Sequence, residues 1–185
     1  MTHLAGPCDA GTATSTEDGA KGSDTGTLVA TVLGSSIAFV TGSVINVALP
    51  EIEVALDTDA AGAQWVINAY LLPLGALVLI GGAMGDHYGR RKLFSLGLAL
   101  FGGASVLCAL APTLSVLLLG RAIQGVGAAM LVPGSLAILG ATFSGPAKGK
   151  AIGTWAAASA ISGGLGPVLG GWLIDNYSWR ALFWA

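Results

Sequence analysis

The 185-residue chain is 54% apolar and only 10% charged, and its formal net charge at pH 7 is −2. A soluble domain carries about 25% charged residues, so this composition excludes an ordinary soluble protein and favours one that lies in a lipid bilayer. The 29 glycines point the same way, because glycine is commoner in membrane helices than in soluble ones. Cys8 and Cys108 have neither metal-ligand nor redox spacing.

Residues 1–26 are rich in Gly, Thr, Ala, Ser and Asp and contain almost no large apolar side chains. Such a segment cannot bury enough surface to offset the entropy lost on ordering, so the sequence predicts a disordered cytoplasmic tail over 1–26. Lys21 is the only basic residue of this tail, and the apolar run that follows is too long for a signal peptide.

Five apolar stretches follow the tail, and each is near or above the roughly 20 residues that cross a bilayer as a helix. A backbone in the membrane must satisfy its hydrogen bonds internally, and runs of this length do so as α-helices. Trp179 and Trp184 resemble an aromatic interface belt that opens a sixth span at about 179. We therefore expect an amino-terminal transmembrane bundle over 27–185 that is an incomplete fragment, with spans at about 28–50, 65–85, 93–111, 114–140 and 151–174.

The basic residues of the connecting segments predict the orientation. Loop 51–64 contains four acids and no basic residue, whereas loops 86–92 and 141–150 carry Arg and Lys. By the positive-inside rule, the amino terminus and these two basic loops are predicted to be cytoplasmic. The chain is accordingly expected to be a multi-pass protein of the cell (inner) membrane.

The segment that joins the second and third spans has the most specific pattern in the chain. Gly89 permits a tight turn between antiparallel helices, and Asp86 lies at the carboxyl end of a helix, where the helix dipole disfavours an acid. Asp86 is therefore expected to have a compensating partner. A merely basic inside loop, which is the alternative, explains the cations but neither the acid nor the glycines. The residues of the pattern are Gly82, Asp86, Gly89, Arg90 and Arg91.

This segment resembles the loop between the second and third helices of the major facilitator superfamily of membrane transporters. The resemblance implies an all-α membrane protein, here the first five helices and the start of the sixth, in a fold that binds substrate between two halves. It also implies that Asp86 contacts the amino end of a helix in the second half, and that the loop latches the cytoplasmic side shut. His87 departs from the family, which usually has Arg at this position.

Arg121 lies several residues inside the fourth span, where a charge costs at least about 2.5–3.5 kcal/mol and normally marks a functional site. Arg121, Gln124 and Gly125 fall on one helix face, and the glycine allows a neighbouring helix to approach. The stretch resembles the family's fourth-helix motif, whose Arg is assigned to proton transfer. The alternative is an Arg whose head reaches the interface. A buried Arg121 is expected to pair with a carboxylate of an absent second half, or to rest on Gln124, carbonyls and water.

The fifth span contains a glycine-rich run around a proline. Pro167 cannot bond the carbonyl of Gly163, so a kink is predicted there. Gly166 and Gly170 have the spacing of a close-packing face. The run resembles the fifth-helix motif of antiporters, although the family has an earlier glycine where this chain has Trp155. A generic packing helix is the alternative. The candidate residues are Gly163, Gly166, Pro167, Gly170 and Gly171.

The segments 43–50 and 64–72 resemble the fourteen-span drug–proton antiporters. Those proteins commonly have an Asp at the position of Thr41, and here every acid lies in a tail, a loop or at a span end. That absence weakens the prediction of proton coupling without affecting the prediction of transport. Thr41, Ser43 and Asn46 are the candidate substrate or coupling residues of the first span.

Together these resemblances imply proton-coupled efflux of drug-like or antibiotic molecules by alternating access. The expected partners are the lipid bilayer, a small-molecule substrate, protons and the missing carboxy-terminal half of the same protein. The residues show no constellation typical of an enzyme, and no metal, cofactor or nucleic-acid partner is expected. Two alternatives remain: an uptake carrier of the same fold, and a truncated or degenerate membrane component that transports nothing.

Overall fold

The structure is a computed structural model, which describes the backbone of residues 14–184 and the side chains of residues 24–184. Five long helices are followed by one short 3-10 helix, and each of the five is long and apolar enough to cross a membrane. The predicted all-α fold, with five spans and the beginning of a sixth element, is confirmed. The elements are α1 (Thr14–Ala55), α2 (Ala60–Tyr88), α3 (Arg90–Ala109), α4 (Leu114–Thr142), α5 (Gly145–Asn176) and η1 (Trp179–Phe183).

The helices begin earlier or end later than the apolar pattern predicts. The backbone is helical from Thr14, whereas the composition predicts a disordered tail over 1–26, and residues 1–13 lie outside the described residues. A long apolar span provides the helix nucleus, and each further residue then adds one hydrogen bond, so polar neighbours join the helix readily. Helix α2 begins at Ala60 because the Asp59 side chain accepts a hydrogen bond from the Gly62 N–H at 2.8 Å.

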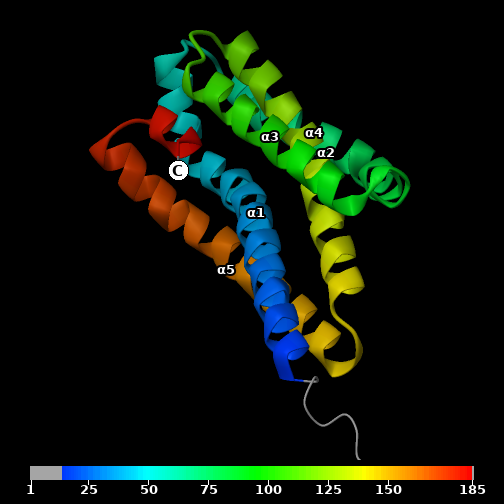
Figure 1. The fold of residues 1–185 in the computed structure, drawn as a ribbon. Helices are drawn as coiled ribbons and strands as arrows, with labels where there is room; N and C mark the ends of the chain where they lie inside the picture. Colours follow the sequence, from blue (N-terminus) through cyan, green and yellow to red (C-terminus); the bar gives the residue numbers. More distant parts are fainter. Residues whose placement is uncertain (1–13, 185) are drawn as a thin grey trace, which may run out of the picture.

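Two groups of helices form the molecule. Helices α1 and α5 lie side by side, and α2, α3 and α4 pack together beside them (Figure 1). Between α3 and α4 the backbones touch, since a Cβ added to Gly127 would lie 2.9 Å from the Gly97 carbonyl oxygen. The short helix η1 closes one end of the bundle, where the buried Trp179 belongs to a core cluster with Ile52 and Leu117. Glycine contacts therefore determine how closely these helices approach one another.

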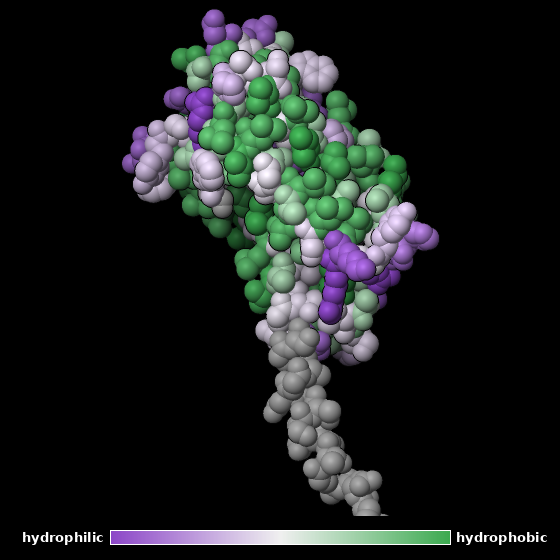
Figure 2. Space-filling view, turned by 45° about the horizontal axis from the view of Figure 1, so that its top comes forward, coloured by the Kyte–Doolittle hydropathy of each residue, from purple (hydrophilic) through white to green (hydrophobic). Residues whose placement is uncertain are grey.

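Apolar side chains cover much of the outer surface. Figure 2 shows a face on which hydrophobic residues fill the middle, whereas hydrophilic residues gather towards its margins. Large apolar residues inside the spans are widely exposed, with Leu79 at 83% and Val168 at 68%. Exposed apolar area of this extent is covered by lipid or by further helices in a membrane protein. The molecule is therefore built as a multi-pass membrane bundle.

Candidate functional site

Arg121 is completely buried at 0% exposure in the first third of α4. The alternative in which its head reaches the membrane interface is therefore wrong. The guanidinium donates from Nε to the Val66 carbonyl oxygen at 3.1 Å and from Nη1 to Gln124 Oε1 at 2.9 Å. Its Cζ lies 4.4 Å from the centre of the Tyr70 ring. Nη2 has no hydrogen-bond partner among the described residues, so one strong donor is left unsatisfied in the interior.

A chain of polar side chains continues from Arg121 into α3. Gln124 donates from Nε2 to Ser105 Oγ at 2.8 Å, and Ser105 donates to the Phe101 carbonyl at 3.0 Å. The thiol of Cys108 lies 3.7 Å from Gln124 Oε1. The expected pairing of Arg121 with Gln124 is thus present, and the network links α2, α3 and α4 through one buried cation.

No carboxylate compensates this cation within residues 24–184. The ion pair that this part of the chain forms is between Arg90 and Asp86, at the turn between α2 and α3. Arg121 is instead held by one backbone carbonyl, one amide oxygen and one aromatic face. Neutral groups of this kind offset only part of the cost of burying a charge.

The turn between α2 and α3 is formed around Gly89. Gly89 has φ 100°, a conformation that favours glycine. Arg90 donates from Nε and Nη2 to Asp86 Oδ1 at 2.9 and 2.8 Å, and from Nη1 to the Ala137 carbonyl of α4 at 3.0 Å. The compensating partner of Asp86 in this structure is therefore Arg90. Arg91 is exposed, and a Cβ at Gly82 would lie 3.6 Å from Pro133 Cβ.

Helix α5 packs on α1 through the predicted glycine face. A Cβ at Gly166 would overlap Ser43 Oγ, and one at Gly170 would overlap Val44 Cγ2, so the predicted close approach is confirmed. A Cβ at Gly171 would lie 4.0 Å from Val47, whereas one at Gly163 meets nothing within 4 Å. Pro167 lies inside α5, which runs as one helix from Gly145 to Asn176.

A second contact joins α1 and α5 nearer the start of α5. The indole Nε1 of Trp155 donates to Ser35 Oγ at 3.0 Å, and its ring meets the Phe39 ring edge-on with centroids 6.1 Å apart. Trp155 is the residue that departs from the family's glycine pattern. In this chain the position therefore supplies a polar and aromatic link between two spans.

The first-span candidates lie apart from Arg121. Thr41 is 8% exposed and lines a cavity of about 370 Å³ together with Trp172 and Leu182. Ser43 donates to the Val40 carbonyl, and Asn46 is exposed and donates to carbonyls of its own helix. No contact in the described part of the chain joins any of these three side chains to the guanidinium.

A family model described as Major Facilitator Superfamily matches residues 31–185. The chain belongs to this superfamily. It is 39% identical over 159 residues to Multidrug resistance protein Stp of Mycobacterium tuberculosis, which covers 85% of this chain and 30% of that protein. It is 40% identical over 154 residues to Puromycin resistance protein pur8 of Streptomyces alboniger, which covers 83% of this chain and 31% of that protein. The chain thus spans less than a third of the length of these relatives.

The fold is also similar to that of a solved transporter homologue. The crystal structure of a bacterial homologue of the human lysosomal transporter Spinster matches with a TM-score of 0.69 and 22% identity, over 86% of this chain and 36% of that one. This likeness shows the fold alone. Membership in a superfamily of transporters confirms the expectation that the chain is not an enzyme.

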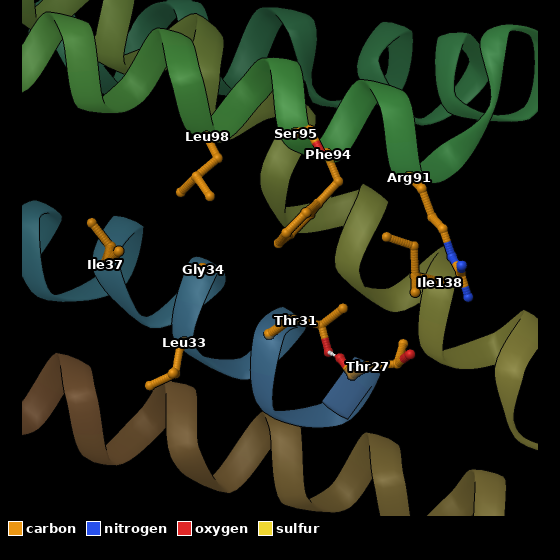
Figure 3. Close-up of a pocket in the computed structure, with 11 residues that line it drawn as sticks. Thr27, Thr31, Leu33, Gly34, Ile37, Arg91, Phe94, Ser95, Leu98 and Ile138 are labelled. Atoms are coloured by element: carbon orange, nitrogen blue, oxygen red, sulfur yellow. Dashed lines mark hydrogen bonds between the residues drawn. The ribbon is translucent and has the colours of Figure 1, made fainter. Parts of the chain in front are cut away.

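Two apolar cavities border α1 in this major facilitator bundle. A cavity of about 480 Å³ lies between α1 and α3, with Phe94 and Leu98 pointing into it and Arg91 at one end (Figure 3). Leu33 and Ile37 line both this cavity and the one that Thr41 lines, so α1 borders one cavity towards α3 and another towards α5.

The sequence pattern does not reveal Val66 and Tyr70 as neighbours of Arg121, or Ser105 as the neighbour of Gln124. Val66 contributes only its backbone carbonyl, and every residue type has one, so the sequence gives no signal for this contact. Ser105 lies in an apolar run of α3 and meets Gln124 only because the glycines bring α3 against α4. For Tyr70 a signal exists, since a buried tyrosine hydroxyl in a span needs a partner.

Proposed function

We propose that the full-length protein exports drug-like molecules and is driven by protons that enter the cell. The observation that carries this proposal is the likeness to proteins named for multidrug resistance and puromycin resistance, at 39% and 40% identity over most of this chain. Antibiotics such as puromycin are accordingly the proposed substrate class. Alternating access between two halves is the mechanism that the fold supports.

The buried charge at Arg121 supports proton coupling in this proposal. Its unsatisfied Nη2 lies in a completely buried side chain, and a guanidinium retains its charge under all cellular conditions. A carboxylate suits that donor best, and the described part of the chain supplies none. We infer that a carboxylate of the carboxy-terminal half approaches Arg121 and carries the proton in a transport state in which the surrounding helices separate, because this bundle alone already encloses Nη2. When it is ionised it pairs with Nη2, and when it is protonated the pairing weakens.

The turn between α2 and α3 is the proposed cytoplasmic latch. Both bonds from Arg90 go to Oδ1 of Asp86, and within residues 24–184 no hydrogen bond reaches Oδ2. The Asp86 side chain is 64% exposed, so it is free to meet a helix amino terminus of the second half. The third bond from Arg90, to Ala137, ties this turn to the helix that carries Arg121. In the same scheme the proposed kink at Pro167 allows α5 to bend between the two open states.

The amino terminus is proposed to be cytoplasmic, in the inner membrane. One shallow cavity is lined by Asp24, Arg90, Arg91, Lys92 and Thr142. The amino-terminal part of α1, the basic turn and the end of α4 therefore lie at the same end of the bundle. Lys148 also reaches α4, since its Cε lies 3.6 Å from a Cβ added to Gly140. This concentration of basic residues supports a cytoplasmic position for that end.

Transport by the full-length protein in proteoliposomes tests the proposal. With an imposed pH gradient, puromycin should move against the direction of proton flow, and collapse of the gradient should stop it. Movement of puromycin or another solute in the same direction as the protons would instead identify an uptake carrier of this fold. Vesicles that move no solute under any gradient would indicate a membrane component without transport activity.

A further inference from the structure

Tyr70 lies where three helices meet, on α2 between the guanidinium of α4 and the backbone of α1. It is 4% exposed, its ring centre lies 4.4 Å from Arg121 Cζ, and its hydroxyl donates to the Ala38 carbonyl oxygen at 3.1 Å. We propose that Tyr70 is a positioning residue, which holds the buried guanidinium with its ring and transmits changes in the pairing of Arg121 to α1 through its hydroxyl. This inference rests on the proposed proton-driven transport.

The ring of Tyr70 stabilises the charge of Arg121, which no acid does in the described part of the chain. The negative face of an aromatic ring attracts a cation, and the attraction is strongest where water is excluded. Val66, one helical turn before Tyr70, accepts the Nε hydrogen bond of the same guanidinium. Helix α2 therefore presents two groups from successive turns to Arg121, and these groups determine where the charge lies.

The backbone of Tyr70 packs directly against Gly125 of α4. A Cβ at Gly125, one turn beyond Arg121, would overlap the Tyr70 carbonyl oxygen. The backbone of α4 thus touches the backbone of Tyr70, while the Arg121 side chain covers its ring. A shift of Arg121 along the axis of α4 must consequently move Tyr70 as well, because close-packed interiors transmit displacement.

The hydroxyl of Tyr70 carries this displacement to α1. A tyrosine that is buried usually finds a partner for its hydroxyl, and here the partner is a backbone carbonyl of a different helix. The same ring also meets α1 one turn further on, where a Cβ at Gly42 would lie 3.5 Å from Tyr70 Cε1. Ala38 and Gly42 lie on either side of Thr41 in the chain, so the contact reaches the part of α1 that lines the cavity between α1 and α5.

The first experiment separates the hydroxyl of Tyr70 from its ring. In the full-length protein, Tyr70→Phe keeps the ring under Arg121 and removes only the hydrogen bond to Ala38. The amount in the membrane and the KM for puromycin should stay at wild type, whereas the maximal rate of pH-driven efflux should fall about fivefold, the effect of one ordinary hydrogen bond. Tyr177→Phe, at an exposed position after α5, is the matched control and should transport as wild type. A wild-type maximal rate in Tyr70→Phe would overturn the inference.

The second experiment tests the ring without any reference to transport. Thermal unfolding of the purified full-length protein is measured for Tyr70→Leu, for Arg121→Gln and for the double variant. If the ring holds the guanidinium, Tyr70→Leu should lower the midpoint more with Arg121 present than in the Arg121→Gln background. Strictly additive losses would contradict the inference. If the wild type moves no drug, the proposed function fails, while a non-additive cycle still establishes the contact between Tyr70 and Arg121.

Discussion

Gly166 of α5 lies so close to Ser43 of α1 that a Cβ at position 166 would overlap the serine hydroxyl. That Cβ would also lie 3.2 Å from both Ser43 Cβ and the Val40 carbonyl oxygen, so rotation of the hydroxyl does not create enough space. The glycine pattern of the fifth span therefore has a direct physical task. It allows two membrane helices to meet backbone to backbone.

Substitution at this contact should separate α1 from α5. We expect Gly166→Ala to destabilise the full-length protein by about 1–3 kcal/mol, the usual range for overfilling a packed interior. The midpoint of thermal unfolding in detergent is the measurement. Gly164→Ala is the matched control, since a Cβ at Gly164 meets nothing within 4 Å, and it should unfold as the wild type does. Equal midpoints for the two variants would show that the contact does not contribute to stability.

Asp86→Asn should impair transport far more than stability. The ion pair with Arg90 is largely exposed, so its loss should cost less than about 1 kcal/mol. Transport per molecule should fall at least about fivefold, since the proposed latch couples the two halves of the transporter. Asp57→Asn is the matched control, because it makes the same acid-to-amide change at the turn after α1. Asp57 has φ 48°, a conformation that asparagine tolerates well. If both variants transport as wild type, the α2–α3 turn acts only as a topology signal.

Thr41→Asp should not restore a lost ion pair. The side chain of Thr41 lines an apolar cavity with Trp172 and Leu182, and the described contacts do not join it to Arg121. A carboxyl group placed there is buried without a cation and should therefore reduce the amount of protein in the membrane. Quantitative blotting of membrane fractions, with Thr41→Val as the matched control, checks this. Normal levels together with a gain in proton movement per drug molecule would show that α1 rotates to bring position 41 to Arg121.

The topology is open to a labelling experiment in intact cells. In a Cys8→Ser background, a cysteine introduced at Lys148 should resist membrane-impermeant thiol reagents, and one at Asp57 should react. Both positions are exposed to solvent at opposite ends of the bundle. Reaction at position 148 and protection at position 57 would reverse the orientation, and would also place the proposed latch outside the cell.

The spans, their number and the Arg121 face could be predicted because each follows from local periodicity and from the dimensions of the bilayer. The Gly166 and Gly170 contact was predictable for the same reason. The pairing of Asp86 with Arg90 had a readable signal, since the two residues are four apart along the chain. The family resemblance instead implies a partner for Asp86 in a second half.

The partners of Arg121 on other helices could not be predicted in the same way. Val66 and Ser105 reach the guanidinium network only after α2 and α3 have packed on α4, and that packing depends on where glycines of different helices meet. The polar composition before the first span does not show how far α1 extends, because a helix can lengthen outward from an apolar span one residue at a time.

Proton movement driven by drug is the measurement that tests the central claim most directly. Full-length protein is reconstituted in proteoliposomes that contain a pH-sensitive dye, and puromycin is added without an imposed gradient. A pH change is expected in the wild type and should be lost in Arg121→Ala, with equal amounts of reconstituted protein in both. A pH change of wild-type size in Arg121→Ala would contradict the claim that this buried cation forms part of the coupling site.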